Sequence, residues 1–158
     1  MPFKKIGKIT GITVGIVFLV IQAIQPERTN PPYDPALTMQ NDLSMPKNIA
    51  NIFNRSCIDC HSDNTRWPLY AYIAPVSWLV SHDVTEGRKH FNMSEWGTYK
   101  TNRKIQRLSG IFQSITDKSM PLPKYLPLHP DARLTDAERD TLAQWAQSTA
   151  EALMGLTD

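Results

Sequence analysis

The stretch Cys57-Ile58-Asp59-Cys60-His61 contains the only two cysteines of the chain, three residues apart, with a histidine directly after the second. Residues at positions i and i+3 of a helical turn lie on the same side of the helix. Two thiols so placed can each add to one vinyl group of a haem, and the imidazole of His61 can then bind the iron. We therefore predict one covalently attached haem c, with Cys57, Cys60 and His61 as cofactor-binding residues and with no catalytic residue.

Three other uses of the two cysteines stay open at this point. A disulfide within so short a loop would be strained. A thioredoxin-like redox pair requires a βαβ context, which the surrounding sequence does not show. A zinc site would require two further ligands at regular spacing, and His82, His90 and His129 are not so spaced.

The second axial ligand of the iron is predicted to be Met120, within Lys118-Ser119-Met120-Pro121-Leu122-Pro123. Prolines stiffen this loop and can hold a weak thioether donor in place. Ligation by His61 and Met120 would raise the reduction potential above that of two nitrogen ligands. The rival ligands are His82, His90 and His129, then Met93 and Met45, and an open sixth position would change the function.

The spacing of apolar residues predicts a mainly α, cytochrome c-like fold. A first helix is expected over residues 47–61, a second over about 76–88, a third over about 98–115, and a last one beginning at a capping box formed by Thr135 and Glu138. Residues 62–75 read as a loop, in which Trp67 is expected to be a wall of the haem pocket. Phe53 and Trp145 are expected to join the first and last helices. The second helix is expected to bury Val76, Leu79, Val80 and Val84.

The N-terminus carries an uncharged, mostly apolar run over residues 9–24, preceded by Lys4, Lys5 and Lys8. This is the pattern of an export signal. Residues 6–25 would reach roughly 30 Å as a helix, enough to span a bilayer core. No small-residue cleavage site follows. We therefore expect residues 1–25 to be a single-pass anchor in the inner membrane, with a cleaved signal or a buried core helix as the alternatives. Residues 26–46 are expected to be a Pro-rich periplasmic linker, and residues 47–158 a haem-binding domain in the periplasm.

The charge balance excludes one class of partner. The chain has 17 basic and 15 acidic residues, and the lysines of the N-terminus account for the excess. The remainder is nearly neutral and has no basic stripe, so nucleic-acid binding has no electrostatic basis. The expected partners are the membrane and redox proteins, and the protein is expected to be a monomer.

The sequence also resembles a family of bacterial proteins known as the haem-binding domain family. The resemblance covers most of residues 45–150. The matching stretches are residues 57–63, Trp67-Pro68, Pro75-Val76-Ser77-Trp78, Glu86-Gly87-Arg88, Phe91-Asn92-Met93-Ser94-Glu95-Trp96, Met120-Pro121, Tyr125, His129-Pro130-Asp131-Ala132 and Leu134. The resemblance implies a periplasmic domain with one c-type haem, and it does not specify a reaction. Electron transfer is the expected function, with a haem-based peroxidase or a gas or redox sensor as the alternatives.

Overall fold

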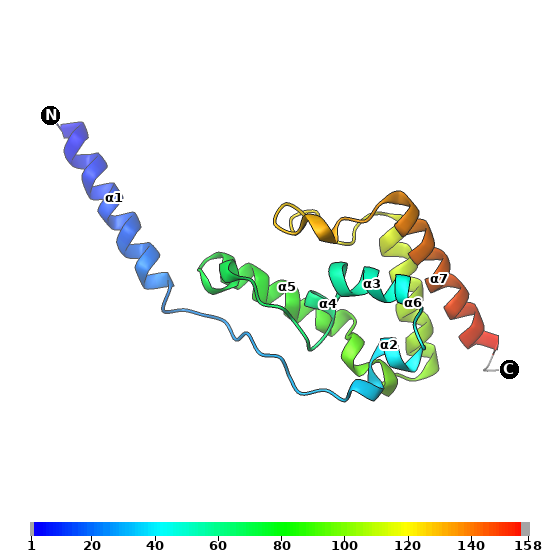
Figure 1. Ribbon diagram of the computed structural model, residues 1–158. Helices are drawn as coiled ribbons and strands as arrows, with labels where there is room; N and C mark the ends of the chain where they lie inside the picture. Colours follow the sequence, from blue (N-terminus) through cyan, green and yellow to red (C-terminus); the bar gives the residue numbers. More distant parts are fainter. Residues whose placement is uncertain (1, 156–158) are drawn as a thin grey trace.

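Helices make up all the regular secondary structure of residues 2–155, which are the residues that the computed structural model describes (Figure 1). The prediction of a mainly α domain is confirmed. The α-helices are α1 (Pro2–Ile21), α2 (Met39–Asp42), α3 (Lys47–Ser56), α4 (Ile58–His61), α5 (Val76–His90), α6 (Thr101–Thr116) and α7 (Asp136–Gly155). Four 3-10 helices lie between them, η1 (Pro35–Leu37), η2 (Leu69–Tyr72), η3 (Met93–Thr98) and η4 (Pro130–Ala132).

The helix α1 projects away from the other helices (Figure 1). It ends at Ile21, so its uncharged part from Ile9 rises only about 20 Å, short of the roughly 30 Å of a bilayer core. None of the helices in the described part of the chain combines the length and the apolarity needed to cross a membrane. The predicted transmembrane helix over residues 1–25 is therefore wrong, and so is the inner-membrane, periplasmic localisation that rested on it. The prediction extended the helix through residues 22–25, which instead form a turn at residues 22–23 followed by chain without regular secondary structure.

The segment predicted as a linker, residues 26–46, lies against the domain. Ser81 Oγ donates a hydrogen bond to the Glu27 carbonyl at 3.0 Å, and Arg88 Nη1 donates to the Thr29 carbonyl at 3.0 Å. Farther along the chain, η1 and α2 pack on η3, and the side chain of Met39 is fully buried. The hydrophobic core therefore begins before residue 47, and the segment is not a free spacer.

The predicted helix over residues 47–61 is interrupted at Cys57. The helix α3 ends at Ser56, and Cys57 has φ −128° and ψ −38°, outside helical geometry. The N–H of Cys57 still donates to the Phe53 carbonyl at 2.9 Å, while the Cys57 carbonyl accepts from the His61 N–H at 3.0 Å. Cys57 therefore closes α3 and opens α4, so the rest of the motif has its own short helix packed on α5.

The buried face of α5 differs from the predicted apolar stripe. Val76 and Leu79 are 41% and 48% exposed, whereas Ser77, Ser81 and Val84 are buried. Small serine side chains allow α5 to lie close to α4 and η2. A prediction from the spacing of apolar residues does not detect a helix face that is buried because its side chains are small. The prediction of the helix was right. The prediction of its buried face was right at Val84 and in part at Val80, which is half-buried, and wrong at Val76 and Leu79.

The core of the domain lies where α3 and α6 pack on α7, with α6 and α7 running antiparallel (Figure 1). The rings of Phe53 and Trp145 meet edge to face with centroids 5.6 Å apart, which confirms the predicted contact between the first and last helices of the domain. The capping box is also confirmed. Glu138 N–H donates to Thr135 Oγ1 at 3.2 Å, and Thr135 N–H donates to Glu138 Oε2 at 2.9 Å.

Candidate functional site

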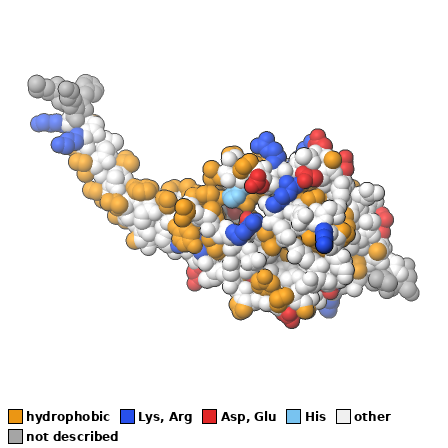
Figure 2. All heavy atoms as spheres, viewed as in Figure 1, with side chains coloured by type: hydrophobic (Ala, Val, Ile, Leu, Met, Phe, Trp, Pro, Cys, Tyr) orange, Lys and Arg blue, Asp and Glu red, His pale blue; other side chains and the backbone are white. Residues whose placement is uncertain are grey.

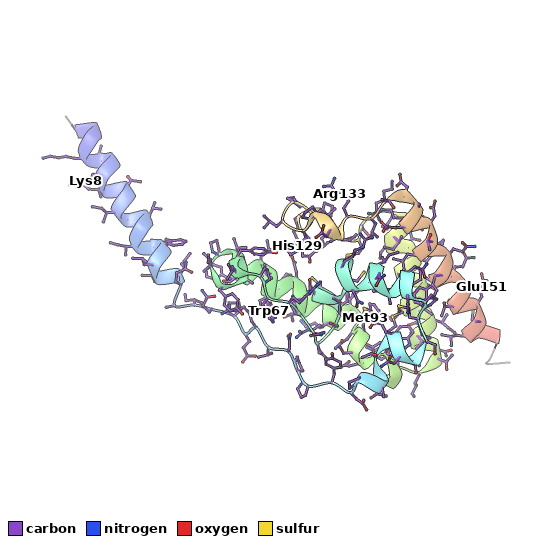
Figure 3. All side chains as sticks on the ribbon, in the orientation of Figure 1. Lys8, Trp67, Met93, His129, Arg133 and Glu151 are labelled. Carbon is purple, nitrogen blue, oxygen red and sulfur yellow. The ribbon has the colours of Figure 1, made fainter. Side chains whose placement is uncertain are left out.

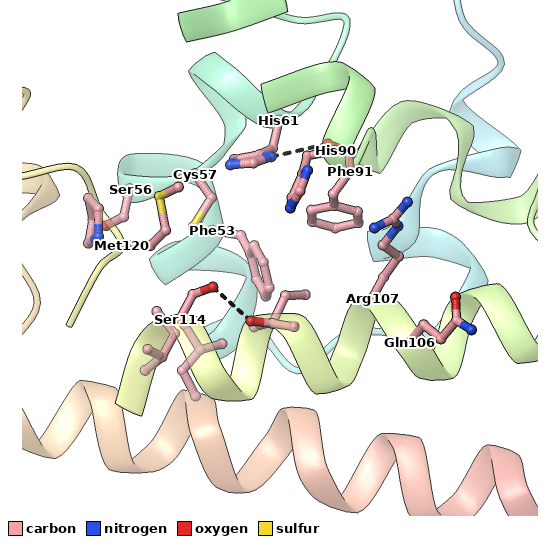
Figure 4. A pocket seen from close by; sticks show the side chains of 15 residues that line it. Phe53, Ser56, Cys57, His61, His90, Phe91, Gln106, Arg107, Ser114 and Met120 are labelled. Carbon is pink, nitrogen blue, oxygen red and sulfur yellow. Dashed lines mark hydrogen bonds between the residues drawn. The ribbon is translucent and has the colours of Figure 1, made fainter. Parts of the chain in front are cut away.

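The imidazole of His61 is oriented by a main-chain oxygen. Its Nδ1 lies 3.1 Å from the carbonyl oxygen of Phe91. A carbonyl can only accept a hydrogen bond, so Nδ1 carries the proton and Nε2 keeps its lone pair. Burial lowers the pKa of His61, which favours the neutral ring. The free Nε2 lies on the side of the ring away from Phe91 (Figure 4) and is suited to bind a metal ion.

The two cysteines of the motif are half-buried and are not joined by a disulfide. Burial raises the pKa of the Cys57 thiol to about 12 and that of the Cys60 thiol to about 11. Both thiols are therefore protonated at neutral pH, unlike the low-pKa thiol of a thioredoxin-like pair. Among the described residues, no group of three or more His, Cys, Asp or Glu side chains is placed to hold a metal ion, so the zinc alternative has no set of ligands there.

Gly87 allows α5 to approach the motif. A Cβ atom at this position would lie 2.4 Å from the backbone oxygen of Cys60 and 3.2 Å from its Cβ. Real Cβ atoms do not approach a backbone atom so closely, so any side chain here would push α5 away from α4. The sequence stretch Glu86-Gly87-Arg88 thus has a steric role beside the motif.

A cavity of about 750 Å³, the solvent at its mouth included, lies between the motif and α6 (Figure 4), and we call it the α6 cavity. Its walls are mainly apolar, as those of cofactor sites usually are. A second cavity of about 920 Å³, the solvent at its mouth included, adjoins it along α5, and we call it the α5 cavity. The residues that line both cavities are Ser56, Cys57, His61, His90, Met120 and Pro121. The motif therefore borders two adjoining hollows that share part of their walls.

The structure places Met120 in the same cavity walls as His61 (Figure 4). The Met120 N–H donates to the Ser114 carbonyl at 3.2 Å, and Arg139 Nη1 donates to the Met120 carbonyl at 2.9 Å. These bonds fix the loop after α6 against α7. The two predicted iron ligands thus share a cavity, and ligation by Met120 stays a prediction.

The rival histidines are placed differently from one another. His90 lines both cavities, at the C-terminal end of α5. His129 lines neither, because its Nε2 is hydrogen-bonded to the Tyr70 hydroxyl and its ring is stacked on that of Tyr125 with centroids 3.8 Å apart. His82 is exposed and also lines neither cavity. Of the predicted rivals, His90 alone shares the cavities with His61.

Trp67, predicted as a wall of the haem pocket, lies in the segment between α4 and η2 (Figure 3). Its side chain is half-buried and lines neither the α6 cavity nor the α5 cavity. The structure therefore does not bring Trp67 to the cavities that the motif borders, and its role there stays a prediction.

A buried polar network fixes the backbone that follows the motif. Arg88 Nε donates to the Ser62 carbonyl at 2.8 Å and lies 3.5 Å from Asp63 Oδ1. Asn92 Nδ2 donates to both carboxylate oxygens of Asp63, at 3.0 and 3.1 Å. Asp63 and Asn92 are almost fully buried, so these bonds compensate the cost of removing them from water. The network ties the motif to the segment that carries the Phe91 carbonyl.

The residues present fit a haem. One face of α6 forms the floor of the α6 cavity, and Gly110 lies on it. A Cβ atom on Gly110 would meet nothing within 4 Å, so the floor is open at that point. Two free thiols border the two adjoining cavities, and the neutral imidazole of His61 presents its Nε2 to them. A haem requires an apolar space for its flat macrocycle, thiols for its vinyl groups and a nitrogen ligand for its iron.

Three contributions to the site were missed in the sequence. The carbonyl of Phe91 belongs to the backbone, and every residue has such a carbonyl, so the residue type does not indicate its role. Arg139, which donates a hydrogen bond to the Met120 carbonyl, lies on the last helix, and nothing in the sequence except its charge distinguishes it from other surface residues. Gly110 did have one, because a glycine inside an amphipathic helix often has a packing or functional reason.

Comparison with known proteins agrees with this site. Residues 16–148 match the family described as "Haem-binding domain". The chain is also similar to "Cytochrome c peroxidase Ccp" of Escherichia coli (strain K12), with 26% identity over 109 residues, which are 66% of this chain and 23% of that protein. No solved structure matches the chain significantly. The chain thus spans about a quarter of the length of this relative. Because the family match covers most of the chain and includes both the motif and the cavities, the protein belongs to the haem-binding domain family.

Proposed function

We propose that this protein is an electron-transfer protein with one c-type haem, attached to Cys57 and Cys60 through thioethers and ligated by His61 and Met120. The observation that carries the proposal is the hydrogen bond from His61 Nδ1 to the Phe91 carbonyl, which leaves Nε2 free beside two unpaired thiols. A bound haem supplies one-electron chemistry at its iron. The protein then acts as a carrier between redox partner proteins and not as an enzyme.

The cysteines have a simple role in attachment. Each S–H adds across one vinyl group, so that sulfur bonds to one vinyl carbon and the hydrogen passes to the other, and no oxidant or reductant is consumed. A protonated, partly buried thiol is a poor partner for disulfide exchange, which agrees with this use.

The other residues orient and shield the site. The Phe91 carbonyl holds the imidazole of His61 in one tautomer and one orientation. Phe53, Ile111 and Leu142 line the α6 cavity with apolar side chains, which favour the apolar macrocycle of a haem over water. We propose that a redox partner approaches at the α5 cavity, with the protein acting as a monomer.

A peroxidase function is the second candidate, and the similarity to the cytochrome c peroxidase of Escherichia coli favours it. This function requires an open iron position and an acid–base group nearby. His90 borders both cavities and is exposed, so it is the side chain best placed for that role.

The attachment is tested on the full chain expressed in a host that matures c-type cytochromes. We expect a pyridine-haemochrome spectrum of the thioether type and a mass increase of one haem. Replacing both cysteines with serine should leave haem that an acidified organic solvent extracts. A wild-type protein without bound haem, or with fully extractable haem, would refute covalent attachment.

Replacing Met120 with Ala separates the two candidate functions. For an electron-transfer protein, the wild type is six-coordinate and low-spin, and its oxidised form shows the weak near-infrared band of methionine–iron ligation. The M120A protein should lose that band and bind carbon monoxide rapidly. A wild type that is high-spin and binds carbon monoxide at once would instead favour the peroxidase or a gas sensor, and M120A with an unchanged spectrum would exclude Met120 as a ligand.

A further inference from the structure

The α6 cavity contains one arginine, Arg107. Arg107 lines it from α6, and its buried Nε has no hydrogen-bond partner in the described part of the chain. Leaving a buried donor unpaired is unfavourable, above all for a charged group, so such atoms in native proteins usually have a ligand, a water or an ion as partner.

The charge of Arg107 is also uncompensated within the cavity. Arg107 carries the only permanent charge among the described residues that line it, and no Asp or Glu is among them. Three other arginines near the motif do have carboxylate partners, namely Arg55 in Glu138, Arg66 in Asp59 and Arg88 in Asp63. The α6 cavity therefore presents a cation that has no carboxylate partner among the described residues that line it.

The position of Arg107 identifies the ligand group. Ser114 lies on α6 near the Cys57 end of the cavity, and Arg107 lies seven residues earlier, about 10 Å away along the helix axis. Figure 4 shows Cys57 and Met120 at one end of the site and Arg107 with Gln106 at the other. A haem carries its vinyl groups on one edge and its two propionate carboxylates on the opposite edge.

We infer that Arg107 binds a propionate carboxylate of the haem, at the end of the α6 cavity opposite the cysteines. The guanidinium presents paired N–H groups that match the two oxygens of a carboxylate. The neighbouring Gln106 has an amide donor at the same end of the cavity. This inference rests on the proposed attachment, because the cysteines determine which edge of the haem faces them.

The arrangement has an electrostatic consequence. A positive charge beside the haem favours the reduced form, which carries one positive charge less than the oxidised form. Removing that charge also leaves the propionate unpaired, and its negative charge stabilises the oxidised form. Both effects lower the reduction potential when Arg107 is replaced with a neutral residue.

The experiment uses the full-length haem-loaded protein with Arg107→Gln, Arg107→Lys and, as the control, Arg103→Gln. Arg103 lies one turn earlier on α6, where it packs over the ring of Tyr99 and does not line the α6 cavity. The readouts are the midpoint potential and the resonance Raman bending mode of the haem propionates, which reports their hydrogen bonds. We expect R107Q to lower the potential and shift this mode, R107K to shift the mode while keeping the potential near that of the wild type, and R103Q to change neither.

Equal potentials and equal propionate modes in R107Q, R103Q and the wild type would overturn the inference. If R107Q does not fold, the propionate mode of R107K decides, and an unshifted mode overturns the inference. Failure of the proposed function is seen separately. It would appear as extractable haem in the wild type, whereas a failure at Arg107 would leave the haem attached.

Discussion

At the scale of single residues, the site depends on close approach and on backbone atoms. Gly87 is the clearest case, since α5 can lie against Cys60 only if this position has no side chain. Phe91 directly follows α5, and its carbonyl orients His61. The placement of α5 therefore controls both the attachment site and the ligand.

Replacing Gly87 with Ala should destabilise the protein by about 1–3 kcal/mol, as overpacking does elsewhere, because the new Cβ would lie 2.4 Å from the Cys60 oxygen. It should also reduce the fraction of chains that carry haem. Denaturant unfolding and haemochrome absorbance per mole of protein measure the two effects. Gly155→Ala is the control, since a Cβ there meets nothing within 4 Å. Equal stability of the two variants would contradict the steric role of Gly87.

At the scale of elements, the start of α7 was predictable and the kink at Cys57 was not. The capping box is a local pattern of Thr135 and Glu138, and local hydrogen bonds satisfy it. Nothing in the residue types of 47–61 indicates a break, because the apolar spacing continues through it. The break depends on packing of α4 against α5, which joins segments distant in sequence.

The ion pair at the start of α7 predicts an acid sensitivity. A hydrogen bond from Arg55, followed by one from the Thr135 N–H, lowers the pKa of Glu138 from 4.5 to about 2. A carboxyl with a lowered pKa stabilises the fold above its unfolded pKa, and this contribution is lost as the pH falls through its folded pKa. The stability of the wild type should therefore fall between about pH 4.5 and about pH 2.

The measurement is the free energy of unfolding as a function of pH for the wild type, Glu138→Gln and Glu151→Gln. The E138Q protein should be less stable near neutral pH and should show a shallower decline in the acid range. Glu151 lies on the same helix away from Arg55 and is held by Gln147, so its replacement should leave the acid slope of the wild type in place. Parallel curves for the wild type and E138Q would refute the prediction.

At the scale of the whole molecule, the segment after α1 is attached to the helical body along α5 (Figure 1). Gln22 exchanges two hydrogen bonds with the backbone of Ala74, at 2.9 and 3.1 Å, and Trp78 Nε1 donates to the Ile24 carbonyl at 2.6 Å. Apolar side chains on the surface gather where α1 meets the body (Figure 2). The position of α1 relative to the domain is therefore set by specific bonds, which the composition of a Pro-rich linker does not reveal.

This attachment should protect the segment from proteolysis. Ser81→Ala removes the hydrogen bond to the Glu27 carbonyl, next to the trypsin site after Arg28. Loss of one hydrogen bond worth about 1 kcal/mol should accelerate cleavage there roughly fivefold. Ser148→Ala, which removes a bond within α7, is the matched control and should leave cleavage after Arg28 unchanged. An unchanged rate in S81A would show that the segment is held by other contacts.

The sequence by itself determined the haem motif, the helical class of the domain, the capping box of the last helix and the contact between Phe53 and Trp145, because each follows from local spacing or from a few strongly apolar residues. The tertiary structure alone decided that α1 ends at Ile21, that the supposed linker contributes Met39 to the core, and that α5 buries serines. It also decided which groups meet at the site, namely the Phe91 carbonyl, the open backbone at Gly87 and Gly110, and the unpaired Arg107. These features depend on how closely segments that are distant in the sequence approach one another in space, and the residue types alone do not determine that approach.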